Sequence, residues 1–140
     1  MFRFFLAYLI YYWGGMYRFI GNRYNMTEAH RTAVRFFSLA YRIDNSYRRA
    51  RMDRGVLLWR ELRQFKEALS DFDALLQEDP TYTQALFNRA MAYQGCGRFD
   101  DAVRDLETYL EMASASSDDY YLMGQRNLIL LKGMLEERED

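Results

Sequence analysis

Apolar and polar positions alternate along most of this chain with the period of an α-helix. In three segments an alanine is followed by a bulky apolar residue four positions later and by a further apolar residue three positions after that. The three alanines are Ala33, Ala68 and Ala102. Steps of four and three place these residues on one side of a helix. The pattern therefore predicts three amphipathic helices, each with one buried face.

The three helices recur at nearly constant intervals, which indicates an internal repeat. Upstream of each alanine lies a small residue that is followed by an aromatic one. The small residues are Gly21, Gly55 and Ala90, and the aromatic residues are Tyr24, Trp59 and Tyr93. A small residue lets two antiparallel helices approach closely, while larger side chains fill the remaining space. Each period is therefore expected to be a helix hairpin.

Local signals mark where helices begin and end. Thr27-Glu28 and Asp100-Asp101 offer caps or negative charge at a helix N-terminus. Asp79-Pro80 ends a helix, because the residue before a proline leaves the α region. Pro80 is the single proline of the chain, so helix is favoured throughout. The expected fold class is all-α.

This pattern resembles the tetratricopeptide repeat (TPR), a family of 34-residue helix hairpins. The last repeat carries the resemblance at Ala85, Ala90, Tyr93, Phe99, Ala102 and Leu106. The middle repeat carries it at Ala50, Gly55, Phe65, Ala68, Phe72, Leu75 and Pro80. The first carries it at Tyr17, Gly21, Tyr24, Ala33, Phe37 and Ala40, with Asn45 where the family favours proline. The resemblance implies an α-solenoid of three hairpins, at residues 15–47, 48–82 and 83–116.

The two ends of the chain flank these repeats. Stacked repeats need a terminal cap with a polar outer side. Residues 117–140 are expected to supply it as a capping helix with an acidic tail. Its apolar face is predicted at Leu122, Leu128, Leu131 and Leu135.

Residues 1–14 are expected to form a separate apolar, aromatic helix that ends at Gly14-Gly15. Its ten central residues cover roughly 15 Å as a helix, about half of a bilayer core, and no signal-peptidase site follows them. The predicted anchor residues are Phe2, Phe4, Phe5, Tyr8, Leu9, Tyr12 and Trp13. Tyr and Trp favour the lipid headgroup zone, but such a helix packs equally well against protein. The sequence leaves contact with lipid and contact with protein open.

Charge and composition narrow the classes of function. The net charge is −1, which gives no support for a nucleic-acid partner. Basic residues crowd the first half and acids the second. The single Cys96 and the single His30 exclude an internal disulfide and a zinc site of the usual ligand number. No phosphate loop or nucleophile motif is present, so neither cofactor, metal nor catalysis is expected. His30 is expected in or near the core, and Cys96 in a turn.

In the TPR family, ligands lie in a concave groove lined by the first helix of successive repeats. The resemblance implies groove residues Arg18, Asn22, Arg49, Met52, Val56, Trp59, Phe87, Asn88 and Met91. A co-chaperone subgroup grips a C-terminal carboxylate with basic and Asn residues in this groove. Arg18 and Asn22 fit that set, but Asp53, Gln84 and Asn88 depart from it. An extended segment or a partner helix is therefore the expected ligand.

The resulting prediction is a non-catalytic adaptor that binds a protein partner. It is expected in the cytoplasm, at the membrane surface, attached through its N-terminus. The alternative is a structural subunit of a multiprotein complex, in which the N-terminal helix is buried against protein partners.

Overall fold

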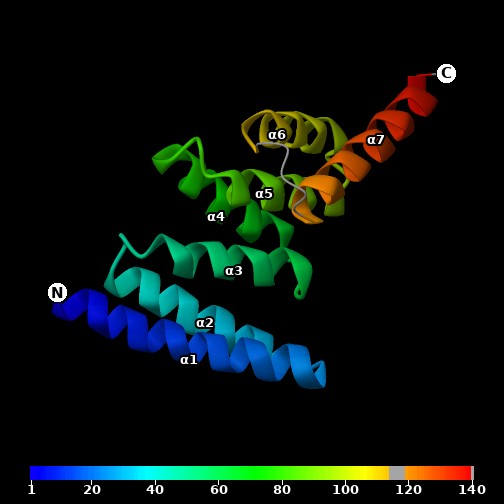
Figure 1. Cartoon of the computed structure of the whole chain (residues 1–140). Coiled ribbons are helices and arrows are strands. Elements are labelled where there is room, and N and C mark those ends of the chain that lie inside the picture. Colours follow the sequence, from blue (N-terminus) through cyan, green and yellow to red (C-terminus); the bar gives the residue numbers. More distant parts are fainter. Residues whose placement is uncertain (114–118, 140) are drawn as a thin grey trace. The chain divides into compact units, whose positions relative to one another are not determined.

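The computed structural model of the chain describes residues 1–113 and 119–139 and contains seven helices there, with no strand among these residues (Figure 1). The helices are α1 (Phe2–Tyr24), α2 (Thr27–Ile43), α3 (Arg48–Arg60), α4 (Phe65–Glu78), α5 (Thr83–Gly95), α6 (Phe99–Met112) and α7 (Asp119–Glu139). The all-α class predicted from the sequence is confirmed. The polar stretch around Ser114 to Ser117 lies outside the described residues.

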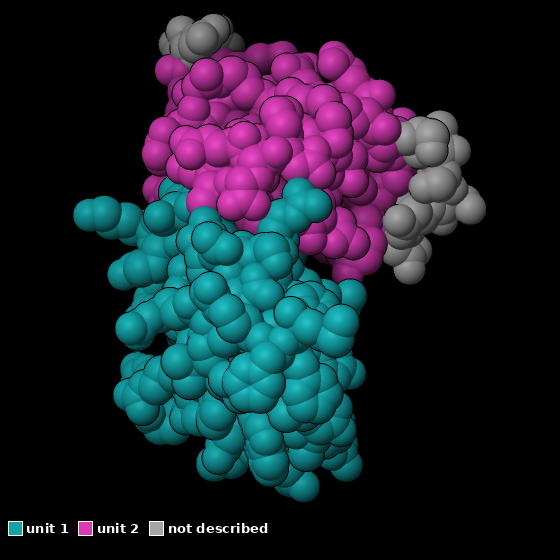
Figure 2. Space-filling model, turned by 90° about the vertical axis from the view of Figure 1, so that its left-hand side faces the viewer, with its two compact units in different colours: residues 1–71 teal, residues 72–140 magenta. Residues whose placement is uncertain are grey.

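The chain divides into two compact units, residues 1–71 and residues 72–140 (Figure 2). The division falls inside α4, so the first turns of this helix belong to unit 1 and its last turns to unit 2. Each unit has its own core, and the two are described separately.

In unit 1, α1 lies beside α2, and α3 packs against α2 (Figure 1). The buried residues of α1 are all small, namely Ala7, Gly14 and Gly21, at intervals of seven. A Cβ atom at Gly14 would lie 2.6 Å from a ring carbon of Phe37, and one at Gly21 would lie 2.3 Å from the ring of His30. Because no side chain separates them, the two helices approach closely.

The same packing corrects the expected boundary at the N-terminus. Helix α1 runs from Phe2 to Tyr24 without a break, so residues 1–14 are its first half and do not form a separate helix. Glycine costs a helix only about 1 kcal/mol relative to alanine. Gly14 is buried against Phe37, so glycine here provides room for helix packing and does not end the helix.

The residues that define the repeat are buried as predicted. Ala33, Ala68 and Ala102 are fully buried, as are the bulky residues four positions after them. In unit 1, Ala33 and Phe37 form a cluster with Leu57, against which the ring of Tyr11 packs. These contacts confirm that the apolar face of each amphipathic helix forms the core.

The turns before α3 and α5 have the same construction, although only one contains proline. Asp44 Oδ1 accepts hydrogen bonds from the backbone N–H of Ser46 (3.0 Å) and from its hydroxyl (2.6 Å). Asp79 Oδ1 accepts the same pair from Thr81, at 3.0 and 2.7 Å. An aspartate that bonds the backbone two residues ahead stabilises a turn by itself. This explains why the first repeat tolerates Asn45 where the family favours proline.

Helix α7 packs against α6 in unit 2. Leu131 is fully buried, and Gly124 lies against the ring of Tyr109. The exposed surface of α7 includes the apolar side chains of Leu122, Met123, Ile129, Leu130 and Met134. One expectation is thereby corrected, because Leu122 does not belong to the buried face. The exposed surface of this cap carries both apolar side chains and polar ones such as Arg126 and Lys132. Leu122 lies about two and a half turns from Leu131 along the helix, which places it on the other side.

Candidate partner-binding surfaces

Repeats two and three each contain an arginine that ties three helices together. Arg54 of α3 forms a bidentate ion pair with Asp71 of α4, and its remaining nitrogen donates to Ser38 of α2 at 2.9 Å. Within this bidentate pair, Arg54 Nε donates to Asp71 Oδ2 at 2.8 Å. Asp71 is buried, and this ion pair raises the pKa of the Arg54 guanidinium above its ordinary value. The role of this arginine is structural, since all its donors face the interior of unit 1.

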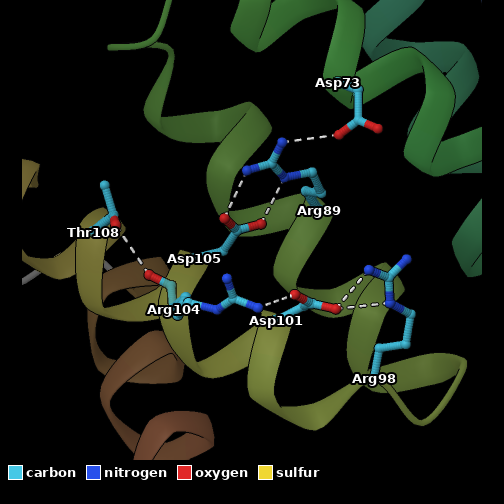
Figure 3. A network of polar contacts seen from close by, with 7 residues as sticks. All are labelled: Asp73, Arg89, Arg98, Asp101, Arg104, Asp105 and Thr108. Atoms are coloured by element: carbon cyan, nitrogen blue, oxygen red, sulfur yellow. Dashed lines mark hydrogen bonds and ion pairs between the residues drawn. The ribbon is translucent and has the colours of Figure 1, made fainter.

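Figure 3 shows the equivalent arginine in unit 2, Arg89 of α5. It donates to both oxygens of Asp105 at 2.7 Å and to Asp73 Oδ1 at 2.8 Å. The hydrogen bonds to Asp105 raise the pKa of Arg89 above its ordinary value. Arg89 and Arg54 are one period apart, and so are their acidic partners, but the sequence analysis did not single them out. The recurrence of these pairs at the repeat interval is the signal that reveals them.

The paired acids Asp100-Asp101 lie in the first turn of α6, where the helix dipole favours negative charge. They do not cap the helix, since the N-cap residue is Arg98 and it makes no side-chain capping hydrogen bond. Asp101 instead binds Arg98 and Arg104 on its own helix end (Figure 3). These acids stabilise the helix start, and their geometry offers no catalytic dyad.

Polar side chains from α1 and α3 meet on one surface of unit 1, which we call the α1–α3 face. It comprises Tyr11, Arg18, Arg49, Asp53 and Val56. The Tyr11 hydroxyl donates to Asp53 Oδ2 at 2.5 Å, and Arg18 Nη1 lies 3.2 Å from the same oxygen. Arg49 Nε donates to the Tyr11 hydroxyl at 3.1 Å. The carboxylate of Asp53 therefore neutralises the guanidinium of Arg18, which was predicted from the sequence to contact a ligand.

Tyr11 is the residue of this face that the sequence analysis placed elsewhere, as part of the apolar N-terminal segment. Burial, reinforced by the neighbouring carboxylate of Asp53, raises the pKa of Tyr11 to about 12. The phenol therefore remains a hydrogen-bond donor at neutral pH. Only the tertiary structure identifies this role, because Tyr11 and Asp53 are far apart in the chain.

The expected groove residues of unit 1 differ in accessibility. Arg18 is partly exposed and Arg49 is exposed, while Val56 and Trp59 are half-buried. Asn22 is exposed and pairs through its side-chain oxygen with Nε2 of the buried His30, at 2.9 Å. Met52 is only 5% exposed and belongs to the core. Most of the predicted groove residues that remain accessible in unit 1 are therefore polar.

The three expected groove residues of unit 2 lie on α5. Phe87 is 5% exposed, because its ring packs against Tyr109 of α6 and Tyr120 of α7. Met91 is 8% exposed, and its sulfur accepts a hydrogen bond from Asn127 of α7. Asn88 is half-buried and donates to the backbone carbonyl of Gln84. Phe87 and Met91 are therefore covered by the following helices, a consequence of packing that the sequence analysis did not anticipate.

The predicted anchor residues are all exposed, and they lie in the first half of α1. We call the outer face of α1 the row formed by Phe2, Phe5, Leu9, Tyr12, Trp13, Met16 and Phe19. Phe4, also predicted as an anchor, is exposed but makes an edge contact with the ring of Tyr47. None of the helices in the described part of the chain combines the length and apolar character needed to cross a bilayer.

The remaining candidates for chemistry are accounted for by packing. His30 is buried against Gly21, as expected for a core histidine, and Cys96 is exposed in the turn after α5. In unit 2 a cleft of about 350 Å³ is lined by Asp73, Arg89 and Asp105 among others, and these three side chains already bind one another. Among the described residues no three His, Cys, Asp or Glu side chains gather as a metal site requires.

Known proteins share parts of this sequence and this fold. Residues 60–125 match the tetratricopeptide repeat family. A DnaJ homolog subfamily C member 7 homolog of Schizosaccharomyces pombe is 34% identical over 67 residues, which are 48% of this chain and 14% of that protein's length.

Two solved structures extend the likeness to nearly the whole chain. PcrH of Pseudomonas aeruginosa has a TM-score of 0.75 at 16% identity, covering 91% of this chain and 92% of its own. The second TPR domain of human RPAP3, solved with an HSP70 peptide, has a TM-score of 0.68 at 17% identity, covering 90% of this chain and 98% of its own. The helix order, the buried repeat positions and the family match agree. Residues 60–125 therefore match tetratricopeptide repeats in sequence, and the chain has the fold of TPR domains over nearly its whole length.

Proposed function

We propose that the protein is a non-catalytic adaptor that binds a segment of a partner protein. The helical hairpins present side chains for contact, and no described cluster of side chains has the arrangement of an active site. The RPAP3 domain, which shares the fold over nearly its whole length, was solved with a peptide bound. The first helices of the repeats, α1, α3 and α5, are the proposed binding elements.

The observation that carries the choice of ligand is the position of Asp53 on the α1–α3 face. Its carboxylate binds Tyr11 and lies 3.2 Å from Arg18. A C-terminal carboxylate of a peptide would have to displace this internal one and would be repelled by it. The proposed ligand is therefore an internal extended segment or a helix, which contacts Arg49, Val56 and Trp59 along α3.

The binding site is tested by affinity capture with the full chain. Arg49→Glu with Val56→Arg changes the α1–α3 face, and Arg126→Glu with Ile129→Arg makes the matching changes at exposed positions of α7. We expect the first pair to lose partner proteins that wild type and the second pair retain, by quantitative mass spectrometry. Recovery of the same partners with both pairs would place the site elsewhere.

The choice of ligand is tested by Asp53→Asn. The variant removes the negative charge beside Arg18 while keeping the shape of the side chain and an oxygen that accepts from the Tyr11 hydroxyl. We expect a peptide with a free acidic C-terminus to bind at least about five-fold more tightly to the variant than to wild type, since about 1 kcal/mol corresponds to that factor. Fluorescence anisotropy measures the affinity, and the amidated peptide is the control. Equal affinities of the two proteins would show that Asp53 does not select against carboxylates.

The outer face of α1 supports a second part of the proposal, attachment of the adaptor to a membrane surface in the cytoplasm. The exposed apolar row is too extensive to remain uncovered in a functional state. The second candidate is burial of this face against other subunits of a protein complex. The same exposure supports it, and the charge and composition of the face distinguish the two.

A further inference from the structure

The outer face of α1 is a continuous apolar ridge. Apart from the adjacent pair Tyr12 and Trp13, its members follow one another at steps of three and four from Phe2 to Phe19, which is the spacing of one side of a helix. Each of them is at least 42% exposed, and Phe2 reaches 77%. The ridge is about 25 Å long at the rise of an α-helix. The opposite side of α1 packs against α2, so the ridge is open to an external partner, and Phe4, Leu6 and Tyr8 beside it are exposed as well.

The composition of the ridge suits a lipid interface better than a partner helix. Five of its seven side chains are aromatic, and two of these, Tyr12 and Trp13, have a polar atom at the tip of an apolar ring. Such side chains favour the headgroup zone of a bilayer. Helix-to-helix seams with the same spacing favour Leu, Ile and Val instead. A fluid surface also requires no matching groove.

The charge around the ridge identifies the kind of lipid. Unit 1 contains 13 Lys and Arg and six Asp and Glu, a net charge of +7, and α1 contains no acidic residue. Arg23 continues the ridge at its C-terminal end. Arg35 and Arg42, two turns apart on the exposed side of α2, form no ion pair within the described part of the chain. This charge opposes the pairing of α1 with α1 of a second copy and favours an anionic surface.

From these observations we infer that the outer face of α1 lies in the headgroup region of an anionic bilayer, with Arg23, Arg35 and Arg42 at the lipid phosphates. The helix lies parallel to the surface, and its ridge enters by about 5–10 Å, the depth of interfacial helices. This inference rests on the membrane part of the proposed function and specifies the lipid charge and the contacting residues. It does not depend on the α1–α3 face.

Co-sedimentation of the full-length protein with vesicles tests the inference. We expect binding to vesicles of phosphatidylcholine and phosphatidylserine, and much weaker binding to phosphatidylcholine alone. Added salt should weaken binding, because it screens the arginines. Each arginine near the surface contributes about five-fold at low salt, so Arg35→Gln with Arg42→Gln should reduce binding about 25-fold. No binding to the anionic vesicles would overturn the inference.

A matched pair of variants locates the contact. Leu9→Glu with Trp13→Glu changes the ridge, while Ile129→Glu with Leu130→Glu makes the same changes at exposed positions of α7. All four side chains are exposed, so circular dichroism should show unchanged helix content. We expect the ridge pair to lose at least ten-fold in vesicle binding and the α7 pair to bind as wild type. Equal losses would overturn the inference.

The depth of the ridge is read from Trp13. The chain has two tryptophans, so Trp59→Phe leaves Trp13 as the only one. We expect brominated lipids to quench its fluorescence, and absence of quenching in sedimented protein would refute the geometry. Sedimentation velocity without lipid tests the rival explanation, pairing with a second copy. An oligomer of wild type that becomes a monomer in the ridge pair of variants would assign this face to a second copy and overturn the inference. Failure of vesicle binding would leave the partner capture by the α1–α3 face untouched, so the two proposals fail separately.

Discussion

Replacing Arg89 by methionine tests whether the repeated arginine holds the helices of unit 2 together. Arg89 is about one-fifth exposed, while its partner Asp105 is buried and relies on both guanidinium hydrogen bonds. Methionine retains most of the apolar stem but leaves the carboxylate of Asp105 without a counter-charge. Removing one partner of a buried ion pair costs about 3–5 kcal/mol. The partial exposure of Arg89 lowers the expected loss to about 2–4 kcal/mol.

The two acids bound by Arg89 should contribute unequally. Asp73 is 47% exposed on its side chain, so Asp73→Asn is expected to cost less than about 1 kcal/mol. Arg89→Met with Asp105→Leu removes both buried charges, and most of the stability should return, since apolar replacement of a buried pair is often neutral. The double variant therefore separates the cost of an orphaned charge from the worth of the pair.

Urea unfolding followed by circular dichroism measures these free energies. A loss of about 3 kcal/mol in a chain of this size also lowers the melting temperature by about 10 °C. A loss below about 1 kcal/mol for Arg89→Met, or no recovery in the double variant, would show that the ion pair does not stabilise the unit. The matched test in unit 1 is Arg54→Met, for which the buried Asp71 predicts a similar loss.

Two further predictions concern α1. Gly14→Ala should destabilise unit 1, because the added Cβ would lie 2.6 Å from the ring of Phe37. Gly15→Ala should stabilise unit 1 by about 0.5–1 kcal/mol, since no atom lies within 4 Å of a Cβ added there. Thermal melts that rank the two variants the other way would contradict the packing. Tyr11 has a pKa of about 12 against an ordinary 10.0, so its stabilisation is complete below pH 10 and is lost as the pH rises to about 12. In Tyr11→Phe, the unfolding free energy should fall less steeply over this range, and equal slopes would refute the assignment.

Local periodicity in the sequence was sufficient to predict the buried faces of the repeat helices. The spacing of Ala33, Ala68 and Ala102 predicts the buried faces, and these alanines are fully buried. Gly21 was expected at a close helix contact, and it lies against His30. Such positions are predictable because the direction of a side chain on a helix follows from its place in the period.

The accessible surface of the candidate site could not be predicted in this way. Arg18 was assigned to a ligand, but Asp53, 35 positions away, neutralises it. Phe87 was expected in a groove, but residues of α6 and α7 cover it. Whether a side chain is free or paired depends on helices that are distant in sequence, and a local sequence pattern does not show which of these helices will lie beside it.

By itself, therefore, the sequence determined the helices, their repeat and their buried faces, because these follow from the helical period and from side-chain size. The tertiary structure alone decided that Gly14 lies inside α1 against Phe37, that Tyr11 and Arg18 share Asp53, and that α7 leaves apolar side chains such as Ile129 exposed. The physical reason is that burial and charge pairing are properties of neighbours in space. Helices brought together by folding supply those neighbours.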